Sequence, residues 1–116
     1  MRVKGGVAAR KRHRKIQHQT KGMTKAHRSS VRRGKQAVTR SLQFAYRDRR
    51  NRKRTFRSLW NSRINAAARL NGTTYNQLIS GMKKSGIMLD RKILAELAVN
   101  EPAAFKAVVE ATQKKN

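Results

Sequence analysis

Residues 31–70, VRRGKQAVTRSLQFAYRDRRNRKRTFRSLWNSRINAAARL, decide the fold of this chain. The stretch contains no proline and a single glycine, and it is rich in Ala, Arg, Leu and Gln, which favour helix. Ser29 or Ser30 can cap its start, and Asn71-Gly72 provides a stop. The pattern predicts one long helix over the whole stretch. At 1.5 Å per residue this helix would be roughly 60 Å long, far more than a small globule needs.

Apolar residues are unevenly distributed along this predicted helix. Before residue 46 they are sparse, being chiefly Val38, Leu42 and Ala45. After residue 55 they become dense: Phe56, Leu59, Trp60, Ile64, Ala67 and Ala68. We therefore expect only the last part of the helix to enter a packed fold.

Residues 71–116 predict three short helices. The first begins at a capping box, in which Thr74 and Gln77 satisfy each other's backbone amides. Asp90 is expected to cap the second helix and Asn100 the third. Apolar side chains at helical spacing predict the core: Leu78, Ile79, Met82, Ile93, Leu94, Leu97, Ala98, Phe105, Val108 and Val109, with Ile87 and Leu89 from the connection.

Residues 1–30 contain too few apolar side chains to form a core of their own. A basic helix from about Ala8 to Thr20 and a disordered tail both fit the pattern, since long blocks of like charge often stay disordered. The expected fold is all-α, with a long basic helical N-terminal arm followed by a small compact C-terminal helical domain. We place the arm at residues 1–58 and the globular domain at residues 59–116.

Net charge is the most unusual property of the chain. Its 116 residues hold 30 Lys and Arg against 5 Asp and Glu, a formal charge of +25. Residues 1–60 hold 21 of these cations and one acid, Asp48, which gives +20. Residues 61–116 hold 9 cations and four acids, which gives +5. The imbalance predicts a polyanionic partner for the N-terminal half.

Several classes of function are not expected. The chain has no cysteine, so it has no disulfide, thiolate zinc site or thiol nucleophile. It has no apolar run long enough for a membrane span or a secretory signal. The three histidines are spaced by five and nine residues, which matches no common metal motif. We therefore predict no enzyme activity, no cofactor, no metal, no membrane partner and no small-molecule substrate. An organellar transit peptide is disfavoured because the basic character continues for sixty residues.

Residues 46–57, YRDRRNRKRTFR, carry the strongest functional signal. On a helix their cations point to nearly all sides. Side chains of the same charge also become neighbours at i,i+4, such as Arg49 with Lys53. Each such pair costs a few tenths of a kcal/mol in an isolated helix. Asp48 with Arg52 is the one expected compensating pair. A solvated surface normally mixes both signs, so a helix ringed by cations indicates surrounding phosphate.

Arginine and aromatic residues favour structured nucleic acid within that class of partner. Residues 1–60 contain 14 Arg and 7 Lys, and the planar guanidinium binds phosphate bidentately and stacks on bases. Phe44, Tyr46, Phe56 and Trp60 are interleaved with these cations. Packing is favoured for Phe56 and Trp60, which leaves Tyr46 as the better candidate for RNA contact.

The strings AYRDRR (45–50), RKR (52–54), LW (59–60), RINAAAR (63–69) and DRKILA (90–95) resemble those of the bacterial large-subunit ribosomal protein twenty family. Tyr75 and the opening RVK (2–4) and GV (6–7), followed by a basic stretch, also fit. Asn61 departs from the pattern, because an apolar residue is expected after Trp60. The resemblance covers essentially the whole chain.

The resemblance implies a structural constituent of the large ribosomal subunit that binds 23S rRNA directly and supports early subunit assembly. Its partners would be 23S rRNA, neighbouring large-subunit ribosomal proteins and, as the alternative function, its own mRNA, which it would bind as a translational repressor. It implies a cytoplasmic location in the large ribosomal subunit; an organellar ribosome is less favoured. A DNA-compacting protein and a nucleic-acid enzyme are weaker alternatives.

The residues predicted to contact rRNA are the exposed cations and rings of the arm, with two arginines from the domain's first helix. They are Arg2, Lys4, Arg10, Lys11, Arg12, His13, Arg14, Lys15, Lys21, Lys25, His27, Arg28, Arg32, Arg33, Lys35, Arg40, Tyr46, Arg47, Arg49, Arg50, Arg52, Lys53, Arg54, Arg57, Arg63 and Arg69.

Overall fold

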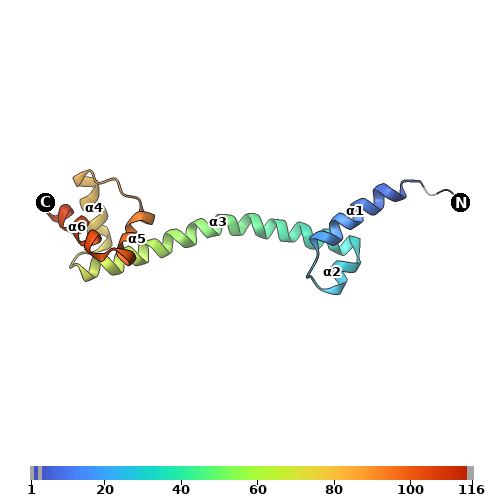
Figure 1. Ribbon diagram of the computed structural model, residues 1–116, viewed down its shortest axis with the longest axis horizontal. Coiled ribbons are helices and arrows are strands. Elements are labelled where there is room, and N and C mark those ends of the chain that lie inside the picture. The colour runs from blue at the N-terminus through green and yellow to red at the C-terminus, as the bar shows by residue number, and fades with distance from the viewer. Residues whose placement is uncertain (1, 3, 115–116) are drawn as a thin grey trace. The chain divides into compact units, whose positions relative to one another are not determined.

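A computed structural model describes residue 2 and residues 4–114. Across these residues the chain forms six helices and no strand (Figure 1), which confirms the all-α prediction. The helices are α1 (Gly6–Gln19), α2 (Lys25–Ser29), α3 (Val31–Leu70), α4 (Tyr75–Ser85), α5 (Arg91–Asn100) and α6 (Pro102–Gln113). None of the helices in the described residues is both long and apolar enough to cross a membrane.

Two compact units meet at the peptide bond between Arg50 and Asn51, inside α3. We call them the N-terminal unit and the C-terminal unit. The predicted division into residues 1–58 and 59–116 concerns independent folding, and it stays a prediction.

Helix α3 has the predicted limits, residues 31–70. At its start the Arg33 N–H donates to the Ser30 hydroxyl at 3.4 Å. At its end the chain turns through Gly72, whose φ of 74° is the left-handed conformation that glycine adopts readily. The Thr73 N–H then donates to the Ala68 carbonyl at 3.0 Å. The predicted stop at Asn71-Gly72 is therefore confirmed.

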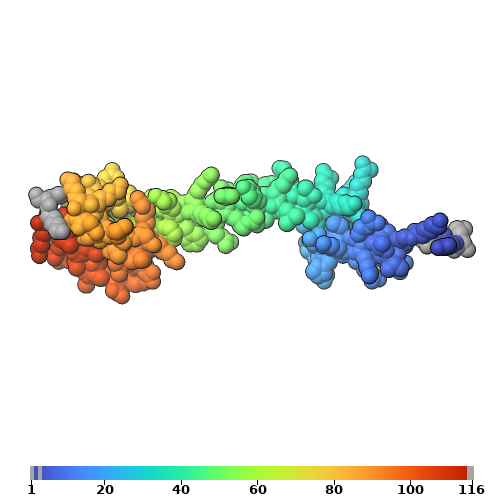
Figure 2. All heavy atoms as spheres, turned by 90° about the horizontal axis from the view of Figure 1, so that it is seen from above, coloured from blue at the N-terminus to red at the C-terminus, as the bar shows by residue number. Residues whose placement is uncertain are grey.

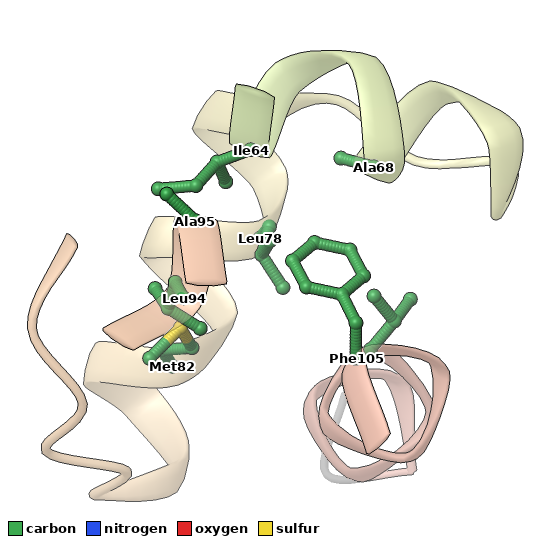
Figure 3. Close-up of a cluster of buried hydrophobic side chains, with 8 residues drawn as sticks. Ile64, Ala68, Leu78, Met82, Leu94, Ala95 and Phe105 are labelled. Carbon is green, nitrogen blue, oxygen red and sulfur yellow. The ribbon is translucent and has the colours of Figure 1, made fainter. Parts of the chain in front are cut away.

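The core of the C-terminal unit is built from α3, α4, α5 and α6. Figure 3 shows the Phe105 ring directed toward Leu78, and Ile64 directed toward Ala95. In the space-filling view the side chains of residues 72–114 pack into one continuous body (Figure 2). The buried hydrophobic side chains are Ile64, Ala68, Leu78, Met82, Leu94, Ala95, Phe105 and Val109, and the half-buried Trp60, Ile87 and Leu89 pack against them.

Helix α5 packs through a slightly different face from the one predicted. Ile93 is 43% exposed and lies outside the core, whereas Ala95 is 1% exposed. Successive residues on a helix point about 100° apart, so a face centred on Leu94 and Ala95 turns Ile93 toward solvent. The prediction of Ile93 as a core residue was wrong, while that of Leu94 is confirmed.

Two of the three helix caps predicted within residues 71–116 are confirmed. The Gln77 N–H donates to the Thr74 hydroxyl at 3.4 Å, and the Thr74 N–H donates to Gln77 Oε1 at 3.2 Å. Asp90 Oδ1 accepts from the Ile93 N–H at 2.8 Å. The prediction for α6 was wrong, because Asn100 ends α5. Pro102 is the first residue of α6, and since proline lacks an N–H this end needs one partner fewer.

The N-terminal unit contains more packing than the sequence predicted. Helix α1 confirms the basic-helix interpretation over the disordered tail, and it lies beside the start of α3 (Figures 1 and 2). Thr20 is completely buried. A Cβ on Gly34 would lie 2.9 Å from Ile16 Cγ2 and 3.0 Å from the His27 carbonyl oxygen. The glycine therefore allows α3 to approach the α1 end closely, and residues 1–30 do take part in a small packed contact.

Candidate nucleic-acid interface

All predicted rRNA-contacting cations and histidines have exposed side chains, and so does Tyr46, which is 57% exposed. Those on α3 occupy helix turns from Arg32 to Arg69. Because α3 is helical throughout, the cations of residues 46–57 project on nearly all sides, as the sequence predicted. The surface can meet phosphate without any rearrangement of the core.

Asp48 pairs with its sequence neighbour Arg47 and not with Arg52 as predicted. Arg47 donates from Nε and Nη2 to Asp48 Oδ1, at 3.1 and 3.0 Å. Both side chains are more than half exposed. An exposed pair of this kind contributes about 0–1 kcal/mol. It is the one ion pair within the part of the chain that the structure describes, so the other cations of α3 carry no acidic partner there.

Aromatic rings of the N-terminal unit hold arginines in place. The guanidinium carbons of Arg40 and Arg47 lie 4.8 and 4.5 Å from the centre of the Phe44 ring. The Arg50 guanidinium carbon lies 5.3 Å from the Tyr46 ring centre, and Arg50 Nη2 donates to the Tyr46 hydroxyl at 3.3 Å. Exposed cation–π contacts contribute about 0.5–1 kcal/mol. The side chains of all three arginines stay exposed, and Arg47 also pairs with Asp48.

A groove in the N-terminal unit brings predicted residues of α1 and α3 together. Its volume is about 590 Å³. The polar lining residues come from both helices, and so do the apolar ones. They are Arg12, His13, Lys15, Gln19 and Lys35, with Ile16, Val38 and Leu42.

The two predicted residues of the C-terminal unit, Arg63 and Arg69, are not brought together. Arg63 lines a groove with Lys92 and Glu96. Arg69 lines a separate groove of about 560 Å³ whose other side chains are neutral and polar: Ser58, Asn61, Ser62, Asn65, Thr74, Tyr75 and Asn76. Six residues apart on a helix corresponds to 240°, which explains the separation.

Asn61, where the family pattern suggests an apolar residue, has a definite polar role. It accepts a hydrogen bond from the Tyr75 hydroxyl at 3.1 Å. The same hydroxyl accepts from Arg91 Nε at 2.8 Å. This chain of hydrogen bonds joins α3, α4 and α5. No local sequence signal links these three residues, because their contact depends on how the helices pack.

The described residues offer no cluster of side chains that could bind a metal ion. No three histidine, aspartate or glutamate side chains there are grouped closely enough to hold an ion. His27 is engaged with the Thr24 hydroxyl, with Nδ1 and Oγ1 3.2 Å apart.

Helical architecture and exposed, largely uncompensated cations together define a class of protein, the basic all-α proteins that bind polyanions such as nucleic acid. The sequence profile of the family described as Ribosomal protein L20 matches residues 2–108. The chain belongs to this family. Its members are structural ribosomal proteins and not enzymes.

Named relatives agree with this assignment over nearly their whole length. Large ribosomal subunit protein bL20 of Marinobacter nauticus is 59% identical over 109 residues, which cover 94% of this chain and 93% of that protein. The protein of the same name from Methylibium petroleiphilum is 57% identical, with 94% and 92% covered. The one from Methylobacterium sp. is 56% identical, with 94% and 87% covered.

Proposed function

We propose that this protein is a structural constituent of the large ribosomal subunit that binds 23S rRNA directly and supports early assembly of that subunit in the cytoplasm. Neighbouring large-subunit ribosomal proteins are its expected protein partners. The relatives named as large ribosomal subunit proteins support this placement.

One observation carries the proposal of direct RNA binding: the exposed cations of α3 have almost no acidic partners. Of the net charge of +25, +20 belongs to residues 1–60. Phosphate oxygens around the helix would relieve the repulsion between its stacked like charges, such as Arg50 with Arg54. The proposed contacts are the cations and rings predicted from the sequence. Their neutralising charge would let rRNA helices approach one another.

Competition between nucleic acids tests this function. The full chain is bound to a labelled 23S rRNA fragment at moderate salt and challenged with the same fragment, duplex DNA or an unrelated RNA. We expect the rRNA fragment to compete best. With 8–10 phosphate contacts, log K should fall against log salt with a slope of about −7 to −9. Equal competition by all three nucleic acids would contradict the proposal.

Translational repression is the alternative use of the same surface. Adding the protein's own mRNA leader as a fourth competitor separates the two cases. Competition by the leader as strong as that of the rRNA fragment would support repression alongside the structural role.

The proposed division at residue 58 is tested by expressing residues 59–116, for which we expect cooperative unfolding.

A further inference from the structure

A second groove, in the C-terminal unit, is lined by two aromatic rings, which we call its floor, and by five cations, which we call its rim. Its volume is about 640 Å³. The floor is formed by Phe56 and Trp60 of α3. Five exposed cations complete the lining, which includes no acidic residue: Arg52, Lys53, Arg54 and Arg57 from α3, and Lys92 from α5. Lys92 was not among the residues predicted from the sequence.

The two rings of the floor differ in how they are held. Trp60 is half-buried and packs against the core of the C-terminal unit. Phe56 is 48% exposed, and its ring centre lies 6.2 Å from that of Trp60, with the planes tilted by 39°. Phe56 is absent from the core cluster and from the side chains packed on it. The fold thus anchors one ring and leaves the face of the other to the groove.

Other exposed rings on α3 are already occupied. Phe44 and Tyr46 each carry guanidinium groups from their own helix, at 4.5–5.3 Å from the ring centres. Among the described residues, no such cation–π contact involves Phe56 or Trp60. Phe56 is therefore the exposed ring of α3 that carries no guanidinium group and can stack on a flat ligand beside the anchored Trp60.

We propose that this groove holds one unstacked nucleobase of the bound RNA, with the flanking phosphates held by the cationic rim; this inference rests on the proposed function. A nucleotide joins a flat ring with two apolar faces to an anionic phosphate, which matches the floor and the rim together. Base stacking on aromatic side chains is the usual way that proteins bind unpaired RNA. In paired RNA the base faces are stacked within the helix, so they cannot stack on the aromatic floor. An acidic protein segment is the competing occupant.

Trp60 makes the proposal directly measurable, because it is the single tryptophan of the chain. The full chain is titrated with two RNA hairpins of equal length, one completely paired and one with a single unpaired base in its stem. We expect both hairpins to bind. The unpaired base should quench the Trp60 fluorescence strongly, and the paired hairpin should leave it nearly unchanged.

Phe56→Ala removes the exposed half of the floor. Loss of one aromatic stacking partner should weaken binding of the bulged hairpin about thirtyfold and leave binding of the paired hairpin unchanged. Phe56→Tyr should restore the affinity. Leu59→Ala is the matched control, since it removes a partly exposed apolar side chain of the same helix that does not line this groove. Circular dichroism checks that each variant keeps its helix content.

The outcomes separate this inference from the function on which it rests. If the wild-type chain binds neither hairpin, the proposed function fails with it. If both hairpins bind with equal quenching, or if Phe56→Ala binds the bulged hairpin as the wild type does, the base-binding groove is wrong while RNA binding stands. Either of these last two results would leave an acidic protein segment as the candidate occupant of the groove.

Discussion

The cation-rich residues 46–57 and the core of the C-terminal unit use the same helix, α3, in opposite ways. In the core, Ile64 and Ala68 are completely buried and touch side chains of other helices. In residues 46–57 every side chain is exposed, and apart from the Arg47–Asp48 pair the charged neighbours carry like charge. The comparison teaches that the helical conformation of α3 has two sources of stability. One is tertiary packing, and the other, in our proposal, is the phosphate of a bound RNA.

The largest effect should come from Phe105→Ala. Phe105 is 1% exposed at the centre of the C-terminal unit, and truncation of a buried Phe costs about 3–5 kcal/mol. A domain of about sixty residues has roughly 3–9 kcal/mol of stability in total, so this unit should be largely unfolded. Urea unfolding followed by Trp60 fluorescence measures the loss. Phe44→Ala should change the midpoint little, and an equal shift in both variants would remove the distinction between the two regions.

Replacing Arg49, Arg50, Lys53 and Arg54 by Gln tests the other side of the comparison. Four lost phosphate contacts should weaken rRNA binding roughly 100-fold at moderate salt and flatten the salt slope by about 3. The same change removes three repulsive i,i+4 pairs, Arg49 with Lys53, Arg50 with Arg54 and Lys53 with Arg57, so the free helix should gain about 0.6–1.5 kcal/mol. Titration calorimetry and circular dichroism measure the two effects.

A matched variant carries the same four-charge change in the C-terminal unit: Lys83, Lys84, Lys106 and Lys114 to Gln. All four lysines are exposed and lie outside the predicted interface. Their loss should alter rRNA binding far less. If the two variants weaken binding equally, net charge alone and not its position governs affinity.

Gly34→Ala should destabilise the small packed contact in the N-terminal unit. Alanine favours helix over glycine by about 1 kcal/mol, but its Cβ would press on Ile16 and on the His27 carbonyl. Overpacking costs about 1–3 kcal/mol, so a net loss of about 1 kcal/mol is expected. Faster amide hydrogen exchange in α1 would reveal it. Ser41→Ala, at an exposed position of the same helix, provides the comparison, and unchanged exchange in Gly34→Ala would refute the close contact.

Thr74→Ala should have the smallest effect. It removes the hydroxyl that accepts from the Gln77 N–H, and loss of such a cap costs about 1 kcal/mol. Thr74→Ser keeps the acceptor and should restore the stability measured by thermal unfolding. A loss of stability in Thr74→Ala but not in Thr74→Ser shows that α4 depends on its cap as well as on the core. Residues 46–57 lie inside α3 and have no cap to depend on. Equal stability of both variants would show that this capping box is dispensable.

Local patterns were enough to predict most of the fold. Residues 31–70, the capping box at Thr74 and the cap at Asp90 depend on neighbours in sequence, and all three are confirmed. Features that depend on how helices pack were missed. These are the close approach at Gly34, the rotation of α5 that exposes Ile93, and the role of Asn61.

The candidate sites also divide into parts that depend on neighbours in sequence, which could be predicted, and parts that depend on helix packing, which could not. The cations of α3 were visible in the sequence because one helix carries them all. Lys92 joins the groove of Phe56 and Trp60 only when α5 packs beside α3. Asp48 shows the limit of spacing arguments even within one helix, since its i,i+4 spacing predicts a pair with Arg52 and the structure pairs it with Arg47.

The single ion pair of the described residues, between Arg47 and Asp48, joins neighbours in sequence and therefore crosslinks no helices. Added salt has little attraction between helices to weaken, while it screens the repulsion spread over the chain. The same ionic strength that releases the protein from RNA should therefore raise its melting temperature when free. A purification in concentrated salt would yield a chain that is unbound and at the same time better folded.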